Sequence, residues 1–154
     1  MIAQMTTGLQ PETMDDRQKY WFAVAICTAI TADGNIAPEE IHYMERALSF
    51  LDSKEQVDSL VKSVKDLKLP DLDRFPGEDR ELASKVFIEL LLVVCSDGVL
   101  GTREVDFLLK VGKRLGFGPE FVRILIRWGS EGIVWKRKMN QMIRLGSEMP
   151  AEFS

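Results

Sequence analysis

Along most of this chain, apolar residues recur at intervals of three and four positions, which is the spacing that one face of an α-helix presents. The pattern is clearest after Pro38, where the apolar positions are Ile41, Met44, Leu48 and Leu51. No stretch of comparable length shows the strict alternation of apolar and polar residues that indicates a half-buried strand. The pattern therefore predicts an all-α protein.

Proline, glycine and capping residues divide the pattern into about seven helices. Pro38 and Pro119 suit the first position of a helix, where the missing N–H costs nothing, and Ser53 suits an N-cap. The segment Gly129-Ser130-Glu131-Gly132 is predicted to end the sixth helix. The predicted helices cover about 16–30, 38–51, 54–67, 78–96, 102–115, 119–128 and 133–145, with a loop at 68–77.

Two segments 64 positions apart, 32–41 and 96–105, share one pattern. In each, an Asp-Gly pair is followed by an aliphatic residue two positions after the glycine and by a glutamate seven positions after the aspartate. An internal repeat of this kind indicates units that pack on one another. We expect two related helix–turn–helix units at about 16–67 and 78–128 and a C-terminal capping helix at about 133–146. Together they form a single domain over 1–154.

A purely structural role accounts for each Asp-Gly unit. Glycine takes the left-handed conformation that ends a helix, and the aspartate accepts hydrogen bonds within the turn. Glu40 and Glu104 fall in the first turn of the following helix, where a carboxylate reaches back to free amide groups.

A role in metal binding is the alternative, because an Asp and a Glu across a tight turn can converge on a hard cation. The candidate ligands are Asp33, Glu39, Glu40, Asp97 and Glu104. A complete EF-hand is excluded, since its first and third ligand positions are occupied by Ala29 and Thr31 in one unit and by Val93 and Cys95 in the other.

Two Asp-Gly-x-aliphatic-x-x-x-Glu units between apolar helices resemble the TerB-like, tellurite-resistance family, which also occurs in the N-terminal part of DjlA-type membrane co-chaperones. The resemblance covers roughly 20–117 and includes Leu115-Gly116-Phe117. It implies a compact helical bundle with a role in divalent-metal binding, stress response or protein assembly. The implied ligands are the five acidic residues named above. The chain departs from the family pattern at Ala37, Gly101 and Arg103, so the second unit fits the metal role less well.

Composition and charge narrow the class of function. Residues 1–99 hold 10 Lys/Arg and 18 Asp/Glu, a net charge of −8, whereas residues 100–154 hold 10 and 6, a net charge of +4. No dominant basic face for nucleic acid follows from these numbers. The longest apolar stretch, 86–95, has about half the length of a membrane span, and no secretory signal precedes the first helix, so we expect a cytoplasmic protein.

Few residues offer catalytic chemistry. His42 is the only histidine, and Cys27 and Cys95 lie in apolar runs where thiols act as small hydrophobes. Cys95, two residues before Asp97, is the thiol to test for oxidation or soft-metal capture. Neither a nucleophile–base pair nor a phosphate-binding loop is present, which predicts a protein without enzymatic activity.

The last predicted helix carries apolar residues on one side and basic residues elsewhere. Such a helix either closes the core of a bundle or lies on a partner or an anionic membrane. The residues predicted to contact a partner are Trp128, Trp135, Lys136, Arg137 and Met139.

Two functions therefore remain open. The first is a non-catalytic TerB-like module that binds a divalent cation (Ca, Mg or Mn) weakly and acts in stress response or in a multiprotein assembly. The alternative is a metal-independent domain that docks a protein partner through the C-terminal Trp/Met/basic face. Peripheral association with a membrane also stays open, and the sequence does not set the oligomeric state.

Overall fold

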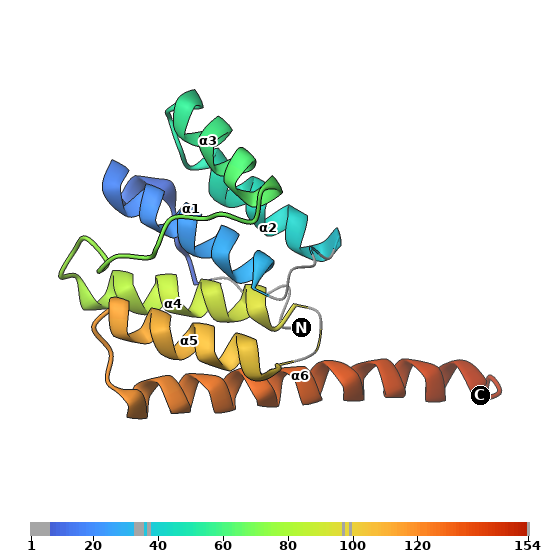
Figure 1. Ribbon diagram of the computed structural model, residues 1–154. Coiled ribbons are helices and arrows are strands. Elements are labelled where there is room, and N and C mark those ends of the chain that lie inside the picture. Colours follow the sequence, from blue (N-terminus) through green and yellow to red (C-terminus); the bar gives the residue numbers. More distant parts are fainter. Residues whose placement is uncertain (1–6, 33–35, 37, 97, 99, 154) are drawn as a thin grey trace.

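In a computed structural model, which describes residues 7–32, 36, 38–96, 98 and 100–153, the chain forms a compact helical bundle (Figure 1). No strand occurs in these described residues, so the all-α prediction is confirmed. The elements are a short 3-10 helix η2 (Pro11–Thr13) and the six α-helices α1 (Asp16–Thr31), α2 (Pro38–Ser49), α3 (Lys54–Lys65), α4 (Arg80–Val94), α5 (Thr102–Arg114) and α6 (Pro119–Glu148).

Helices α1 and α4 form the centre of the bundle and pack against each other. Helices α2 and α3 cover α1 on one side, whereas α5 and α6 cover α4 on the other (Figure 1). Because partners lie on opposite sides, α1 and α4 are apolar around most of their circumference, with nearly every residue from Trp21 to Ile30 and from Val86 to Val94 buried.

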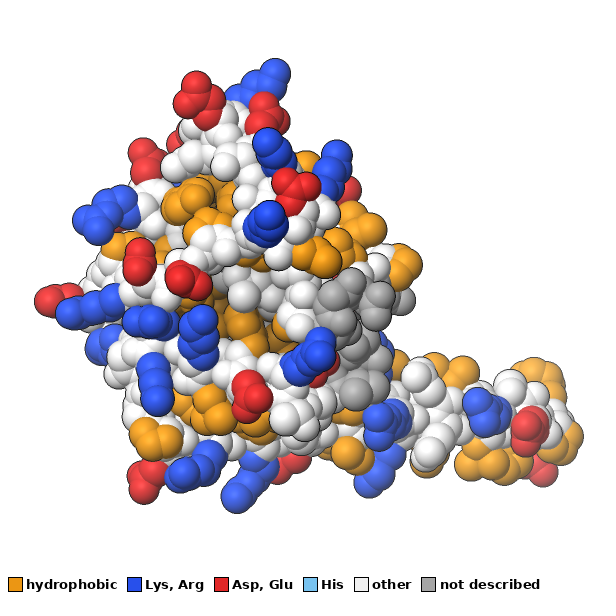
Figure 2. Space-filling view, viewed as in Figure 1, with side chains coloured by type: hydrophobic (Ala, Val, Ile, Leu, Met, Phe, Trp, Pro, Cys, Tyr) orange, Lys and Arg blue, Asp and Glu red, His pale blue; other side chains and the backbone are white. Residues whose placement is uncertain are grey.

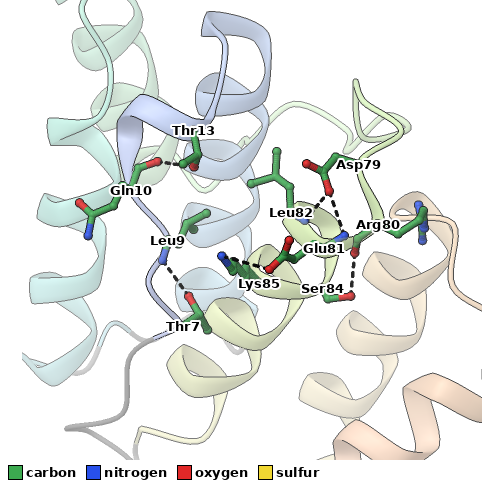
Figure 3. A network of polar contacts seen from close by, with 10 residues as sticks. All are labelled: Thr7, Leu9, Gln10, Thr13, Asp79, Arg80, Glu81, Leu82, Ser84 and Lys85. Atoms are coloured by element: carbon green, nitrogen blue, oxygen red, sulfur yellow. Dashed lines mark hydrogen bonds and ion pairs between the residues drawn. The ribbon is translucent and has the colours of Figure 1, made fainter.

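Polar side chains fix where several helices begin. Asp15 caps α1 in a capping box with Gln18, and Ser53 Oγ accepts a hydrogen bond of 3.3 Å from the Gln56 amide at the start of α3. At α4, the Asp79 carboxylate accepts hydrogen bonds from two amides of the first turn, including that of Leu82 at 3.1 Å (Figure 3). The predicted starts at Pro38, Thr102 and Pro119 and the predicted cap at Ser53 are confirmed.

Equivalent helices begin at equivalent positions along the chain. Helices α1 and α4 start at residues 16 and 80, and α2 and α5 start at 38 and 102, so both pairs are separated by 64 residues. Gly98 has φ +78°, the left-handed conformation expected for the glycine of an Asp-Gly turn. Gly34 of the first unit lies outside the described residues.

The prediction of about seven helices is wrong at the C-terminus, where one continuous helix, α6, replaces two. Gly129 does not break the helix because its lack of a side chain serves packing. A Cβ atom at Gly129 would lie 3.0 Å from Leu91 Cδ1 and 3.1 Å from Cys95 Sγ. The glycine thus lets the α6 backbone lie directly against α4, and packing overrides its low helix propensity.

Candidate interaction surface on the C-terminal helix

The face of α6 that packs against the bundle changes from apolar to polar halfway along the helix. In the first half this face is made by buried residues at spacings of three and four, namely Val122, Leu125, Gly129 and Ile133. The same spacing continues through Lys136, Asn140, Arg144 and Ser147. Since these polar side chains have no reason to leave water, the sequence itself ends the contact between α6 and the bundle.

Beyond Ile133 the helix extends past the rest of the molecule (Figure 1). We call residues 134–148 the projecting half of α6. Only Lys136 and Met139 in it are half-buried, and all its other residues are exposed. Its large apolar side chains lie open to solvent, with Trp135 64% and Met142 63% exposed, and Figure 2 shows apolar side chains along this arm. Helix formation here relies on the anchored half of α6, because a helix of this length is marginal alone.

The exposed apolar residues of α6 follow a repeat of seven. Trp128, Trp135 and Met142 are each seven residues apart, and so are Gly132, Met139 and Gly146. Together they alternate at spacings of four and three along one line of the helix, which we call the outer seam. Lying opposite the face that packs on α4 and α5, the outer seam has no partner among the described residues except at the half-buried Met139 and Gly132.

The projecting half is also strongly basic. From Ile133 to Ser147 it holds four cationic residues and no Asp or Glu. The cations are Lys136, Arg137, Lys138 and Arg144. Exposed apolar area beside concentrated positive charge is the composition of a surface that meets an apolar, negatively charged partner.

The five predicted partner-binding residues all lie on α6 but do not share one face. Trp135 belongs to the exposed outer seam, as do the less exposed Trp128 and Met139. Arg137 instead turns to the bundle, where its Nη2 atom donates a hydrogen bond of 2.8 Å to the Gly98 carbonyl oxygen. The expected closing of the core by this helix is not observed, because its large apolar residues are exposed.

Sequence reasoning left Met142 out of the partner-binding set and did not consider other exposed apolar residues of this region, Ile143, Leu145 and Met149. A signal was available, since the seven-residue spacing from Trp128 leads directly to Met142 and Met149. The prediction of a helix break at Gly129 and Gly132 hid this spacing, because it placed Trp128 and Trp135 on separate helices.

The metal prediction receives little support from the described residues. Asp33 and Asp97 lie outside them, as does the side chain of Glu39, while Glu40 is half-buried on α2. Glu104 folds back over the N-cap of α5, where a Cβ atom on Gly101 would lie 2.8 Å from its Oε2 atom. No group of three or more His, Cys, Asp or Glu side chains suited to a metal ion occurs in the described part of the chain.

A positive charge stands beside the second Asp-Gly turn. The Arg137 guanidinium that binds the Gly98 carbonyl would repel a divalent cation bound at the same turn. Together with Arg103 in the first turn of α5, it makes the second unit a poor fit for a metal ion.

The remaining candidates for chemistry are inert in position. His42 is exposed, and both cysteines are fully buried. Burial raises the pKa of the Cys27 thiol to about 11, so the reactive thiolate is scarce at neutral pH.

Within the described residues, no helix combines the length and the apolar character that crossing a membrane requires. Comparisons with protein-family models, with curated protein sequences and with solved structures find no match to this chain.

Proposed function

We propose that this chain is a non-catalytic interaction module that docks an acidic amphipathic helix of a protein partner along α6. The observation that carries the proposal is the change of face at Ile133, which directs polar residues toward the bundle and leaves the apolar outer seam to a partner. A protein that needed α6 only for its own core would have no use for Trp135 and Met142 at the surface.

The geometry of the outer seam favours a helix as the partner. A seven-residue apolar repeat keeps its register along a second helix that supercoils around the first. Trp128, Trp135 and Met142 supply large side chains, and the intervening Gly132 and Gly146 leave room for side chains of the partner. A lipid surface requires no such register, only a broad apolar face.

The charge of the projecting half favours an acidic partner over a second copy of this chain. Two projecting halves side by side would bring together eight positive charges, four from each copy, with no carboxylate between Ile133 and Ser147. Acidic residues flanking the partner's apolar stripe would remove this repulsion and speed association.

The test uses two synthetic helical peptides with the same leucine heptad seam, one flanked by glutamate and the other by lysine. Trp21 is already buried, so an emission change on titration reports Trp128 and Trp135. We expect a saturable blue shift with the glutamate peptide and none with the lysine peptide. Replacing Met142 by Glu puts a charge into the seam and should weaken binding at least tenfold.

Gln141→Glu is the matched control, because it adds the same charge to the neighbouring exposed position outside the seam. Three results would overturn the proposal: a blue shift only with anionic lipid vesicles, a shift produced by raising the concentration of the chain alone, or equal binding of both peptides. The first would assign the surface to a membrane, and the second would assign it to self-association.

The two-unit organisation and the TerB-like assignment belong to this proposal as its structural frame. The shared offset of 64 residues between the helix starts supports two related units. Figure 1 places the end of α1, the end of α4 and the starts of α2 and α5 at the same end of the bundle, which supports weak divalent-cation binding there as a second candidate function.

A further inference from the structure

A cavity of about 290 Å³ lies at the opposite end of the bundle, between residues 74–78 and the end of α5. Four of its lining residues are cationic, namely Arg74, Arg80, Lys113 and Arg114, against the single carboxylate of Glu78. Figure 2 shows Lys and Arg side chains gathered at the left edge of the molecule, where Figure 1 places the start of α4 and the end of α5.

These four cations have no carboxylate partner. Three ion pairs within 4.0 Å join described residues, and they involve Lys19, Arg46 and Lys85. None of the cations that line the cavity takes part, although the chain as a whole carries more Asp and Glu than Lys and Arg. Unpaired like charges around one cavity repel one another, so their grouping costs stability unless an anion joins them.

Capping of α5 does not require this charge either. Every backbone carbonyl from Val111 to Leu115 already accepts a hydrogen bond from another group. The Arg114 oxygen accepts from the Phe75 amide at 2.8 Å, and the Leu115 oxygen accepts from Arg80 Nη2 at 2.9 Å. The side chains of Lys113 and Arg114 are therefore not needed to satisfy the helix terminus.

The corresponding corner of the first unit has the opposite charge. Subtracting 64 from Arg80 and Gly116 gives Asp16 and Asp52, which line a separate cavity at the start of α1 and the end of α2. There Lys19 lies 3.9 Å from Asp52 and balances it. The same helical corner thus folds without a basic cluster, which makes the charge at residues 74–116 a property of this site rather than of the fold.

One of the cations is held rigidly. Arg80 extends from the first turn of α4 toward the neighbouring helix (Figure 3), and its guanidinium lies 4.5 Å from the centre of the Phe117 ring. Its hydrogen bond to the Leu115 carbonyl fixes the orientation further. A guanidinium already in place contributes its charge to ligand binding without a new loss of side-chain entropy.

We propose that this basic cavity is a binding site for a small phosphate-bearing anion, with Arg74, Lys113 and Arg114 as direct contacts. Guanidinium and ammonium groups are the usual donors to phosphate oxygens. The volume suits a phosphate or diphosphate group rather than a large organic ligand, because drug-sized pockets begin at roughly 300 Å³. The site is separate from α6 docking and does not depend on it.

The test is a titration of the full chain with inorganic pyrophosphate at fixed ionic strength, followed by amide NMR. We expect saturable shifts at Gly77 and Gly116, the two glycines of the cavity lining. The variant Lys113→Gln with Arg114→Gln should raise the Kd at least tenfold, since hydrogen bonds between charged groups are the strong ones. Arg144→Gln on the projecting half of α6 removes an exposed cation elsewhere and should leave the Kd unchanged.

Sulfate at matched ionic strength is the comparison that assigns the ligand class. Binding of sulfate as tight as that of pyrophosphate, shifts that do not saturate, or an unchanged Kd in the folded double variant would each overturn the proposal. Circular dichroism establishes that the double variant is folded. Because Met142→Glu alters the outer seam alone, pyrophosphate binding in that variant should equal that of the unmodified chain whether or not α6 docks a helix.

Discussion

Arg46 of α2 and Glu89 of α4 form an ion pair across the bundle, with 3.0 Å between Arg46 Nη1 and Glu89 Oε2. Glu89 is 3% exposed, and its other carboxylate oxygen accepts a hydrogen bond of 2.9 Å from Thr7 Oγ1. Both oxygens of this buried carboxylate are thus satisfied by segments far apart in sequence. The pair joins α2 to α4, which otherwise meet through α1.

Removing the cation should leave a buried charge without its partner. We expect Arg46→Leu to lower the free energy of unfolding by about 2–4 kcal/mol, below the full cost of breaking a buried pair because the Arg46 side chain is partly exposed. The double variant Arg46→Leu with Glu89→Leu should recover much of this loss. Urea denaturation of both variants and of Glu89→Leu forms a double-mutant cycle, and additive losses would contradict the pairing.

The Cys27 thiol should make stability depend on alkaline pH. Burial raises its pKa to about 11, so between the ordinary thiol pKa and that value the unfolded chain releases a proton that the folded chain keeps. Stability should therefore fall as the pH rises through this range, by roughly 2–3 kcal/mol in total. Denaturation of Cys27→Ala at the same pH values supplies the baseline, and parallel curves for the two proteins would refute the assignment.

Gly129 and Gly146 offer a matched pair of substitutions on one helix. Leucine favours helix formation at both positions, but only at Gly129 would its side chain collide with Leu91 and Cys95. We expect Gly129→Leu to lower the free energy of unfolding by about 1–3 kcal/mol and Gly146→Leu to leave it unchanged or raise it slightly. Equal effects in thermal denaturation would mean that α6 does not lie against α4 as described.

Shortening α6 should hardly affect the bundle. A chain ending at Asn140 lacks only residues that are exposed in the described part of 141–154. Its helical circular dichroism should fall in proportion to the lost turns, while its free energy of unfolding should change by less than about 0.5 kcal/mol. A loss of 2 kcal/mol or more would show that the projecting half packs on the bundle in solution.

Divalent-cation binding, if present, should be unequal in the two units. Arg103 and Arg137 place positive charge near the second Asp-Gly turn only, so Ca²⁺, Mg²⁺ or Mn²⁺ should shift the amide of Gly34 more than that of Gly98. NMR titration of chelator-treated protein measures both. Arg137→Ala should narrow the difference, and an absence of shifts up to millimolar cation would remove the metal function from consideration.

Much of the secondary structure was predictable because its signals are local. Ser53, Pro38 and Thr102 act within one helical turn, so their effect on the start of a helix does not depend on the rest of the fold. Gly129 failed as a signal for the opposite reason. Its effect depends on Leu91, a residue 38 positions away that no local pattern connects to it.

The candidate sites divide in the same way. The sequence indicated Trp128 and Trp135 as partner-binding residues because large apolar side chains beside basic ones are visible in a single segment. It could not indicate the basic cavity, since Arg74 and Arg114 come from segments 40 residues apart that meet only through the hydrogen bond from the Phe75 amide to the Arg114 carbonyl.

The sequence by itself determined the helical class, most helix starts and the face of α6 on which polar residues replace apolar ones after Ile133. Each of these follows from spacing within one helix. The tertiary structure decided that α6 is continuous, that Glu89 is paired with Arg46, and that four cations surround one cavity. These features depend on which surfaces meet, and contacts between distant segments arise from packing the whole chain at once.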